Sequence, residues 1–217
     1  MPPPRLLLLL LLALPFSVSP PAETPQVIRT FMPEATPSSF AVTFANGINI
    51  CYDPVRGSTR YAWVGPGIDL SPARPGNGKF IKAASLQGTL VYQEDEDAPL
   101  RVSLNGQTPE VVFKGYQILP DSVVFYTLVD GVPLSEEIQP RSDGRGIVRR
   151  FRRGGHPTTR DRDNPHLRSI EVWYVPGKIS KGQLAMRGGD IAGNGYHFTL
   201  DEKSRFELDV TFAQTQP

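Results

Sequence analysis

Four residues near one predicted strand have side chains of the types that bind sugars: Arg60, Tyr61, Trp63 and Asp69. Alternation along a strand puts Tyr61 and Trp63 on the same face. If that face points outward, the two rings form a platform for a sugar ring, flanked by an arginine and an aspartate that hydrogen-bond hydroxyls. If it points inward, both rings belong to the core. Core packing is the favoured interpretation for any single aromatic residue on a strand, and a carbohydrate-binding site beside the glycine- and proline-rich stretch 65–79 is the candidate function for these four residues.

A second pair of aromatic residues, Trp173 and Tyr174, follows later in the chain. Adjacent positions of a strand point to opposite faces, so these two rings do not form a shared platform. We therefore rank Trp173 below the first group as a sugar-binding candidate.

Arginine residues form the other candidate group. Residues 139–168 contain nine arginines and three aspartates, and four of the arginines, Arg149, Arg150, Arg152 and Arg153, are close neighbours. In an extended strand Arg150 and Arg152 face one way and the other two face the opposite way. Guanidinium groups bind phosphate or sulfate groups bidentately, which predicts contacts to an anion or to an acidic protein partner. We favour the other interpretation of this segment, a solvated, mobile hairpin whose charge is offset by acidic residues elsewhere.

The remaining chemistry-bearing residues give no catalytic or metal-binding pattern. The histidines His156, His166 and His197 are dispersed, and none has a cysteine or a second histidine at metal-ligand spacing. The acidic run 94–97 lacks the alternating spacing and the glycine of a calcium loop. No Gly-x-Ser-x-Gly motif occurs, and Cys51, the only cysteine, lies in an alternating run that predicts a buried strand. The sequence thus predicts no metal and no cofactor.

The elements that must position these residues are short strands. The 217 residues include 20 glycines and 22 prolines spread along the chain, so few helix-length stretches are free of them. Runs of β-branched and aromatic residues fill the intervals, which predicts an all-β fold: an antiparallel β-sandwich with mostly meander and hairpin connections. The predicted strands cover residues 26–31, 40–44, 48–52, 59–64, 89–93, 100–104, 110–118, 123–129, 132–138, 169–175, 182–187, 196–200 and 206–212.

The order of these strands predicts the domain organisation. We expect a single β-sandwich domain over residues 23–217, with an irregular arginine-rich insertion near 139–168. Residues 65–79 are expected to form a long irregular loop, and the meander 110–138 to form the centre of the fold. The Asn46-Gly47 dipeptide predicts a tight hairpin.

The first 22 residues have the pattern of a secretory signal peptide. One positive charge, Arg5, precedes the apolar run 6–14, which is shorter than the roughly 20 residues that span a bilayer. This predicts a periplasmic or secreted protein with no membrane span after signal removal; a retained anchor is the alternative. The formal net charge of +1 gives no reason to expect nucleic acid as a partner.

Several short motifs resemble a β-rich module of exported proteins from planctomycete- and verrucomicrobia-like bacteria. The motifs are Asn46-Gly-Ile-Asn-Ile-Cys-Tyr-Asp53, Thr59-Arg-Tyr-Ala-Trp63, Gly67-Ile-Asp-Leu70, Phe113-Lys-Gly-Tyr116 and Phe125-Tyr-Thr-Leu-Val-Asp-Gly-Val132. In those proteins the module often accompanies c-type cytochrome domains and quinoprotein sugar dehydrogenase propellers.

The resemblance covers residues 27–139 and implies an extracytoplasmic, accessory role. It implies a c-type cytochrome or a quinoprotein dehydrogenase as a partner, and it carries over no catalytic residue. One cysteine cannot form the Cys-x-x-Cys-His haem attachment motif, so the chain is not itself a c-type cytochrome.

Together these observations predict an exported, non-catalytic binding or accessory module that acts beside periplasmic redox or sugar-oxidising proteins and binds carbohydrate. The alternative is a carbohydrate-active enzyme whose carboxylate pair is assembled by the fold, because such a pair need not be adjacent in sequence. A structural domain of the envelope is the third hypothesis.

Overall fold

The computed structural model describes residues 24–73, 82–154, 169–201 and 204–214. The predicted signal peptide, residues 1–22, lies outside the described residues, as do residues 155–168 of the predicted insertion. Within the described ranges, no helix is long and apolar enough to cross a membrane.

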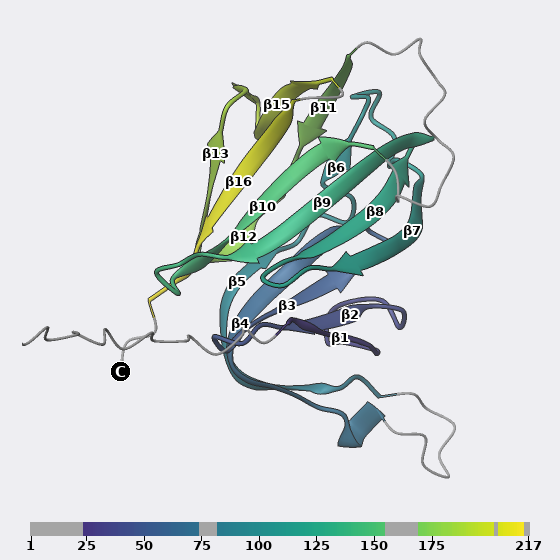
Figure 1. Ribbon diagram of the computed structural model, residues 1–217. Helices are drawn as coiled ribbons and strands as arrows, with labels where there is room; N and C mark the ends of the chain where they lie inside the picture. Colours follow the sequence, from purple (N-terminus) through teal and green to yellow (C-terminus); the bar gives the residue numbers. More distant parts are fainter. Residues whose placement is uncertain (1–23, 74–81, 155–168, 202–203, 215–217) are drawn as a thin grey trace, which may run out of the picture.

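The fold is all-β and sandwich-like, as predicted, and consists of three antiparallel sheets (Figure 1). The first sheet has the order β1 (Gln26–Arg29), β2 (Phe40–Thr43), β3 (Ile48–Asp53), β4 (Ser58–Asp69), β5 (Ser85–Glu94) and β12 (Ile179–Lys181). The second has the order β13 (Gln183–Arg187), β16 (Arg205–Thr211), β10 (Gly146–Arg153), β9 (Val132–Pro140), β8 (Val123–Val129) and β7 (Val111–Ile118). The third has the order β14 (Asp190–Ala192), β15 (Gly195–Leu200), β11 (Ile170–Tyr174) and β6 (Leu100–Arg101).

Glycine-containing turns form the hairpins that the sequence predicts. Gly47, with a φ of 78°, turns β2 into β3, and the side chain of Asn46 accepts a hydrogen bond from the backbone N–H of Ile48. Asp130 and Gly131 both have positive φ, 48° and 80°, between β8 and β9. Two successive positive φ values are typical of a type I′ turn, whose twist matches that of the flanking strands.

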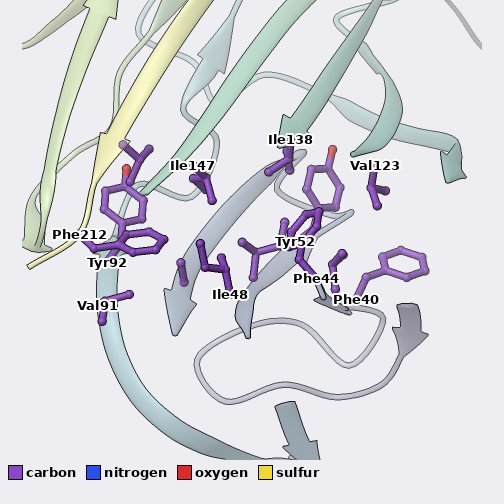
Figure 2. Close-up of a cluster of buried hydrophobic side chains, with 14 of the residues drawn as sticks. Phe40, Phe44, Ile48, Tyr52, Val91, Tyr92, Val123, Ile138, Ile147 and Phe212 are labelled. Carbon is purple, nitrogen blue, oxygen red and sulfur yellow. The ribbon is translucent and has the colours of Figure 1, made fainter. Parts of the chain in front are cut away.

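The first and second sheets enclose the main hydrophobic core. Figure 2 shows side chains from both sheets meeting there, among them Tyr52 and Val123. The rings of Tyr52 and Phe125 are stacked with centroids 3.7 Å apart. From the predicted central meander, β8 and β9 contribute buried residues to this core, whereas β7 is a largely exposed edge strand.

The third sheet covers another part of the same face of the second sheet. Phe206 of β16 stacks on Phe198 of β15, with centroids 3.6 Å apart, and on Phe151 of β10, with centroids 4.5 Å apart. Val172 and Leu200 complete this contact from β11 and β15. The inner face of the second sheet is therefore buried by both other sheets, and its outer face is left uncovered by them.

The arginine-rich segment is not irregular over its described part. Residues 146–153 form β10, which pairs with β9 on one side and β16 on the other. Ile147 and Phe151 point into the two cores, and this apolar alternation places the strand inside the sheet despite its four arginines. The prediction of an irregular insertion is thus wrong for residues 146–153, which form a central strand of the second sheet.

The predicted loop 65–79 is also regular in its first part. β4 continues to Asp69 and is followed by a short 3-10 helix, η1 (Ser71–Ala73). The continuation depends on a close approach of two glycines: a Cβ on Gly65 would lie 2.2 Å from the backbone oxygen of Gln87, and one on Gly88 would lie 2.1 Å from that of Val64. Residues 74–79 lie outside the described residues.

Candidate functional site

The predicted aromatic platform on β4 is buried. Trp63 is 0% exposed and Tyr61 is 3% exposed, and their rings lie 6.0 Å apart in a third hydrophobic cluster. The indole N–H donates to the backbone oxygen of Gly67 at 2.8 Å, and the Tyr61 hydroxyl donates to that of Pro33 at 2.9 Å. Because residues before β2 and after η1 cover this face of the first sheet, the two rings are core, and the predicted surface platform is corrected.

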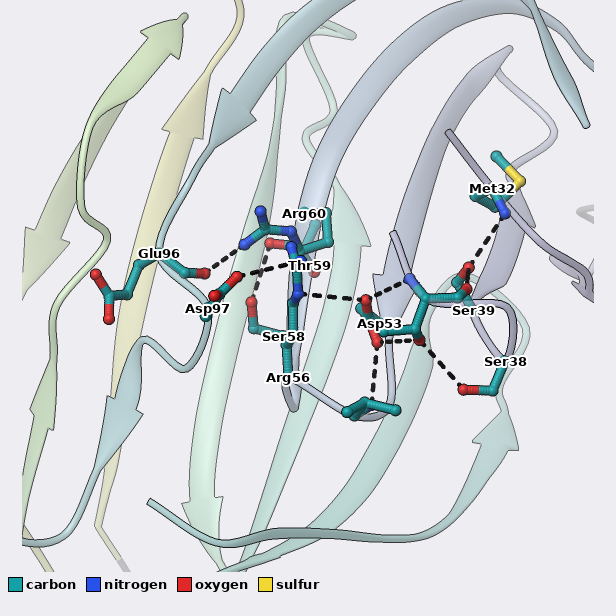
Figure 3. Close-up of polar contacts among 12 residues, drawn as sticks. Met32, Ser38, Ser39, Asp53, Arg56, Ser58, Thr59, Arg60, Glu96 and Asp97 are labelled. Atoms are coloured by element: carbon teal, nitrogen blue, oxygen red, sulfur yellow. Dashed lines mark hydrogen bonds and ion pairs between the residues drawn. The ribbon is translucent and has the colours of Figure 1, made fainter. Parts of the chain in front are cut away.

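The two polar residues of that predicted site do not come together on the surface. Arg60 is buried, and its guanidinium donates to the backbone oxygen of Glu96 (Figure 3). Asp69 is half-buried at the end of β4, where its carboxylate accepts a hydrogen bond from the backbone N–H of Ser71 at 2.8 Å. Both side chains therefore have a structural role, since each forms a hydrogen bond with a backbone group of another residue.

The four candidate arginines of β10 alternate between the two faces, as predicted, but only some of them are accessible. Arg149 is fully buried, and Arg150 is half-buried against Glu207 and Gln139, at 2.9 and 2.8 Å. Arg152 is exposed and Arg153 is half-buried. The prediction that Arg149 contacts an external anion is therefore corrected, because its side chain points into the sandwich.

Arg149 is the centre of a buried charge cluster. Its Nη1 donates to Glu94 at 2.9 Å and to the hydroxyl of Tyr174 at 2.6 Å, and its Nε donates to Glu136 at 2.6 Å. The Tyr174 hydroxyl donates in turn to Glu94. Glu94 belongs to the first sheet, Arg149 and Glu136 to the second, and Tyr174 to the third. The cluster therefore joins all three sheets.

Burial controls the protonation of this cluster. The side chains of Arg149 and Glu94 are 0% exposed, and that of Glu136 is 4% exposed. Burial raises the pKa of Glu94 despite the opposing effect of the guanidinium. Burial alone would lower the pKa of Arg149, but Glu136 and the other surrounding groups outweigh it and raise that pKa. The cluster therefore favours a charged arginine and resists holding two ionised carboxylates.

The cluster brings two carboxylates together, which is the arrangement that the enzyme hypothesis requires. A glycosidase places its substrate between such carboxylates, whereas here the guanidinium of Arg149 occupies that position. Among the described residues, the Arg149 Nη2, the Glu136 Oε2 and the Tyr92 hydroxyl have no hydrogen-bond partner. All three atoms are buried, so they give no access to a sugar substrate. The geometry supports a structural role for this pair.

Sequence reasoning missed this cluster for an identifiable reason. Glu94 begins an acidic run that is typical of a solvated turn, yet it is the last residue of β5 and points inward. Glu136 is the Cα partner of Phe151, two positions from Arg149 on the neighbouring strand, and both Glu136 and Arg149 occupy inward positions of alternating runs. The sequence did contain a signal for this cluster: each of the two strands has a charged residue at a position where alternation predicts an inward-facing side chain.

An accessible aromatic site lies on the outer face of the third sheet. Trp173 of β11 is directly opposite His197 of β15, and the two rings are stacked with centroids 4.9 Å apart. Glu171 is hydrogen-bonded to the imidazole of His197 and accepts a hydrogen bond from the Thr199 hydroxyl at 3.1 Å. We call these four residues the Trp173 face.

Alternation explains why the Trp173 face is open. The neighbours Val172 and Tyr174 point into the core between the second and third sheets, so Trp173 points away from it and is half-buried. The side chain of His197 is 29% exposed and that of Glu171 is 47% exposed. The prediction that Trp173 and Tyr174 face opposite ways is confirmed.

A wide groove of about 910 Å³ lies at one end of the sandwich. The β9–β10 turn lines it with Arg141 and Arg145, and the end of β16 lines it with Phe212 and neighbouring residues. Arg141 is already paired with Asp143 at 2.7 Å and Asp209 at 3.0 Å. The groove therefore presents a largely neutralised wall and no group of converging reactive side chains.

In the part of the chain that the structure describes, no group of three or more histidine, cysteine or acidic side chains is placed to hold a metal ion. No protein-family model matches this chain, and neither a curated protein nor a solved structure matches it.

Proposed function

We propose that this protein is a non-catalytic carbohydrate-binding module and that the Trp173 face is its sugar site. The observation that carries the proposal is the half-buried Trp173 stacked on His197, on the face of the third sheet that points away from the core shared with the second sheet. The C–H groups of a sugar ring pack on an aromatic ring and bury apolar area there. Hydroxyl groups of the sugar would meet the exposed acceptor and donor groups of Glu171 and Thr199.

The cellular setting is part of the same proposal. The signal-peptide pattern of residues 1–22 supports export, and the resemblance of residues 27–139 supports an accessory role beside redox or sugar-oxidising proteins. In such a setting this module would hold the sugar, a quinoprotein dehydrogenase would oxidise it, and a c-type cytochrome would accept the electrons.

The decisive experiment uses the fact that the chain has only two tryptophans, Trp63 and Trp173. Trp63→Phe removes the buried fluorophore and leaves Trp173 as the sole reporter. Purified Trp63→Phe protein is titrated with a panel of mono- and oligosaccharides. We expect a saturable fluorescence change for at least one sugar.

Calorimetry with the same sugar then identifies the site. Trp173→Ala should weaken binding at least about tenfold, since stacking and ring burial together are worth about 1.4 kcal/mol or more. Trp63→Phe is the matched control and should bind like the wild type. A flat response across the panel, or unchanged affinity of Trp173→Ala, contradicts the proposal.

A further inference from the structure

The outer face of the second sheet carries a row of charges that neutralise one another. Glu207 of β16 lies between Arg150 of β10 and Arg187 of β13, with its two oxygens 2.9 and 3.6 Å from them. Asp209 binds Arg187 at 2.7 Å and Arg141 at 3.0 Å. Every carboxylate of β16 on this face is therefore already paired with arginine.

One pair of arginines on this face is outside that row. Arg152 of β10 and Arg205 of β16 are direct Cα partners in the register of the two strands. Both side chains are exposed, and neither forms an ion pair or a side-chain hydrogen bond with any described residue. Like charges directly opposite one another destabilise a sheet, so within the described residues this pairing is unfavourable.

Among the described residues, the carboxylates of the neighbouring strands pair with other arginines and not with these two. On β9 the Cα partner of Arg152 is Ser135, whose hydroxyl is directed to the backbone oxygen of Arg152 at 3.5 Å. Glu207 is two positions from Arg205 on the same face, but Arg150 and Arg187 engage its two oxygens. In the part of the chain that the structure describes, neither guanidinium group has a side-chain acceptor, and the Cα atoms that carry the two side chains are direct partners.

We propose that Arg152 and Arg205 form a binding site for a tetrahedral oxyanion, a sulfate or a phosphate group. Guanidinium groups bind such anions through parallel N–H···O bonds, and an anion between the two arginines removes their mutual repulsion. The third sheet packs against the inner face of the second, so this site and the Trp173 face lie on opposite sides of the molecule. The oxyanion site is independent of the proposed sugar site.

The test measures binding of inorganic sulfate and inorganic phosphate to the full chain by calorimetry, at ionic strength matched with chloride. Arg152→Gln and Arg205→Gln should each weaken binding about tenfold, and the double variant should abolish it, because each removes charge-assisted hydrogen bonds. Arg145→Gln is the matched control: Arg145 is exposed, lies on the β9–β10 turn and lines the groove instead. It should bind like the wild type.

A second arm distinguishes the source of the anion. Dextran sulfate and unsulfated dextran are compared on the wild type and the same four variants. Retention on dextran sulfate that the double variant loses indicates a sulfate ester on a polymer, whereas binding of the inorganic ions alone indicates a free ion. Thermal unfolding confirms that each variant is folded, and removal of either arginine should leave the midpoint unchanged or raise it. Binding that is unchanged in the double variant, or that Arg145→Gln reduces equally, overturns the proposal.

Discussion

Replacing Arg149 with methionine should destabilise the protein severely and in a pH-dependent way. Arg149→Met removes three hydrogen bonds, to Glu94, Glu136 and Tyr174. It also leaves two carboxylates in a site where the side chains are 0% and 4% exposed. Removing one partner of a buried ion pair costs about 3–5 kcal/mol, because the remaining charge is uncompensated. We expect a loss of about this size in the free energy of unfolding at pH 7.

The sign of the pH dependence follows from the carboxylates. Burial already raises the pKa of Glu94 in the wild type, and loss of the guanidinium raises it further. A carboxyl group with a raised pKa in the folded state contributes most stability below its unfolded pKa, about 4.3. That contribution is lost as the pH rises through the folded pKa. The difference between Arg149→Met and wild type should therefore increase as the pH rises above the unfolded pKa, and be smaller at pH 5 than at pH 7.5.

The assay is urea unfolding at pH 5 and pH 7.5, followed by fluorescence of the buried Trp63. Arg150→Met is the matched control, since Arg150 is the next residue on the same strand, faces the opposite way and pairs with Glu207 at the surface. It should cost less than about 1 kcal/mol. Adding Glu94→Gln to Arg149→Met should recover part of the loss. A loss below about 1 kcal/mol for Arg149→Met, or one independent of pH, would refute this reasoning.

Two further predictions concern buried groups. Burial raises the pKa of the Cys51 thiol to about 12. A thiol-specific disulfide reagent at pH 8 should therefore leave the folded protein unmodified and react fully with the protein in urea. Rapid reaction of the folded protein would contradict the burial of Cys51. Gly88→Ala should cost more than about 2 kcal/mol, because Gly88 has a φ of 140° and its new Cβ would lie 2.1 Å from the backbone oxygen of Val64. Gly106→Ala, with a φ of 78° and nothing within 4 Å of the Cβ, is the control and should cost about 1 kcal/mol in the same unfolding assay. Equal losses for the two variants would show that the close approach at Gly88 is absent.

The sequence alone determined the fold class and most of the strands. Period-two runs between glycine and proline predict strands because the pleat puts successive side chains on opposite faces, and the predicted runs 48–52 and 123–129 correspond to β3 and β8. The Asn46-Gly47 and Asp130-Gly131 turns were readable for the same local reason, since their positive φ values suit these residue types.

The sequence could not show that arginine-rich residues form a central strand. Four arginines in residues 149–153 indicate a solvated segment by composition, and β10 lies in the middle of the second sheet. The compensating charges come from Glu94, 55 positions away in the chain, and from Glu136 on the neighbouring strand. Only the packing of three sheets brings these groups together.

The candidate sites depended on which face of each strand is covered. Alternation predicts that Tyr61 and Trp63 share one face of their strand. It also predicts that the consecutive residues Trp173 and Tyr174 point to opposite faces. Both predictions agree with the structure. Whether such a face is core or surface is decided by what packs on it, and a strand's own residues do not contain that information. The first sheet is covered on both faces, so Trp63 is core, whereas the third sheet is covered on one face, so Trp173 is accessible. Tertiary packing, through burial of apolar area between sheets, therefore decided where a ligand can reach the protein.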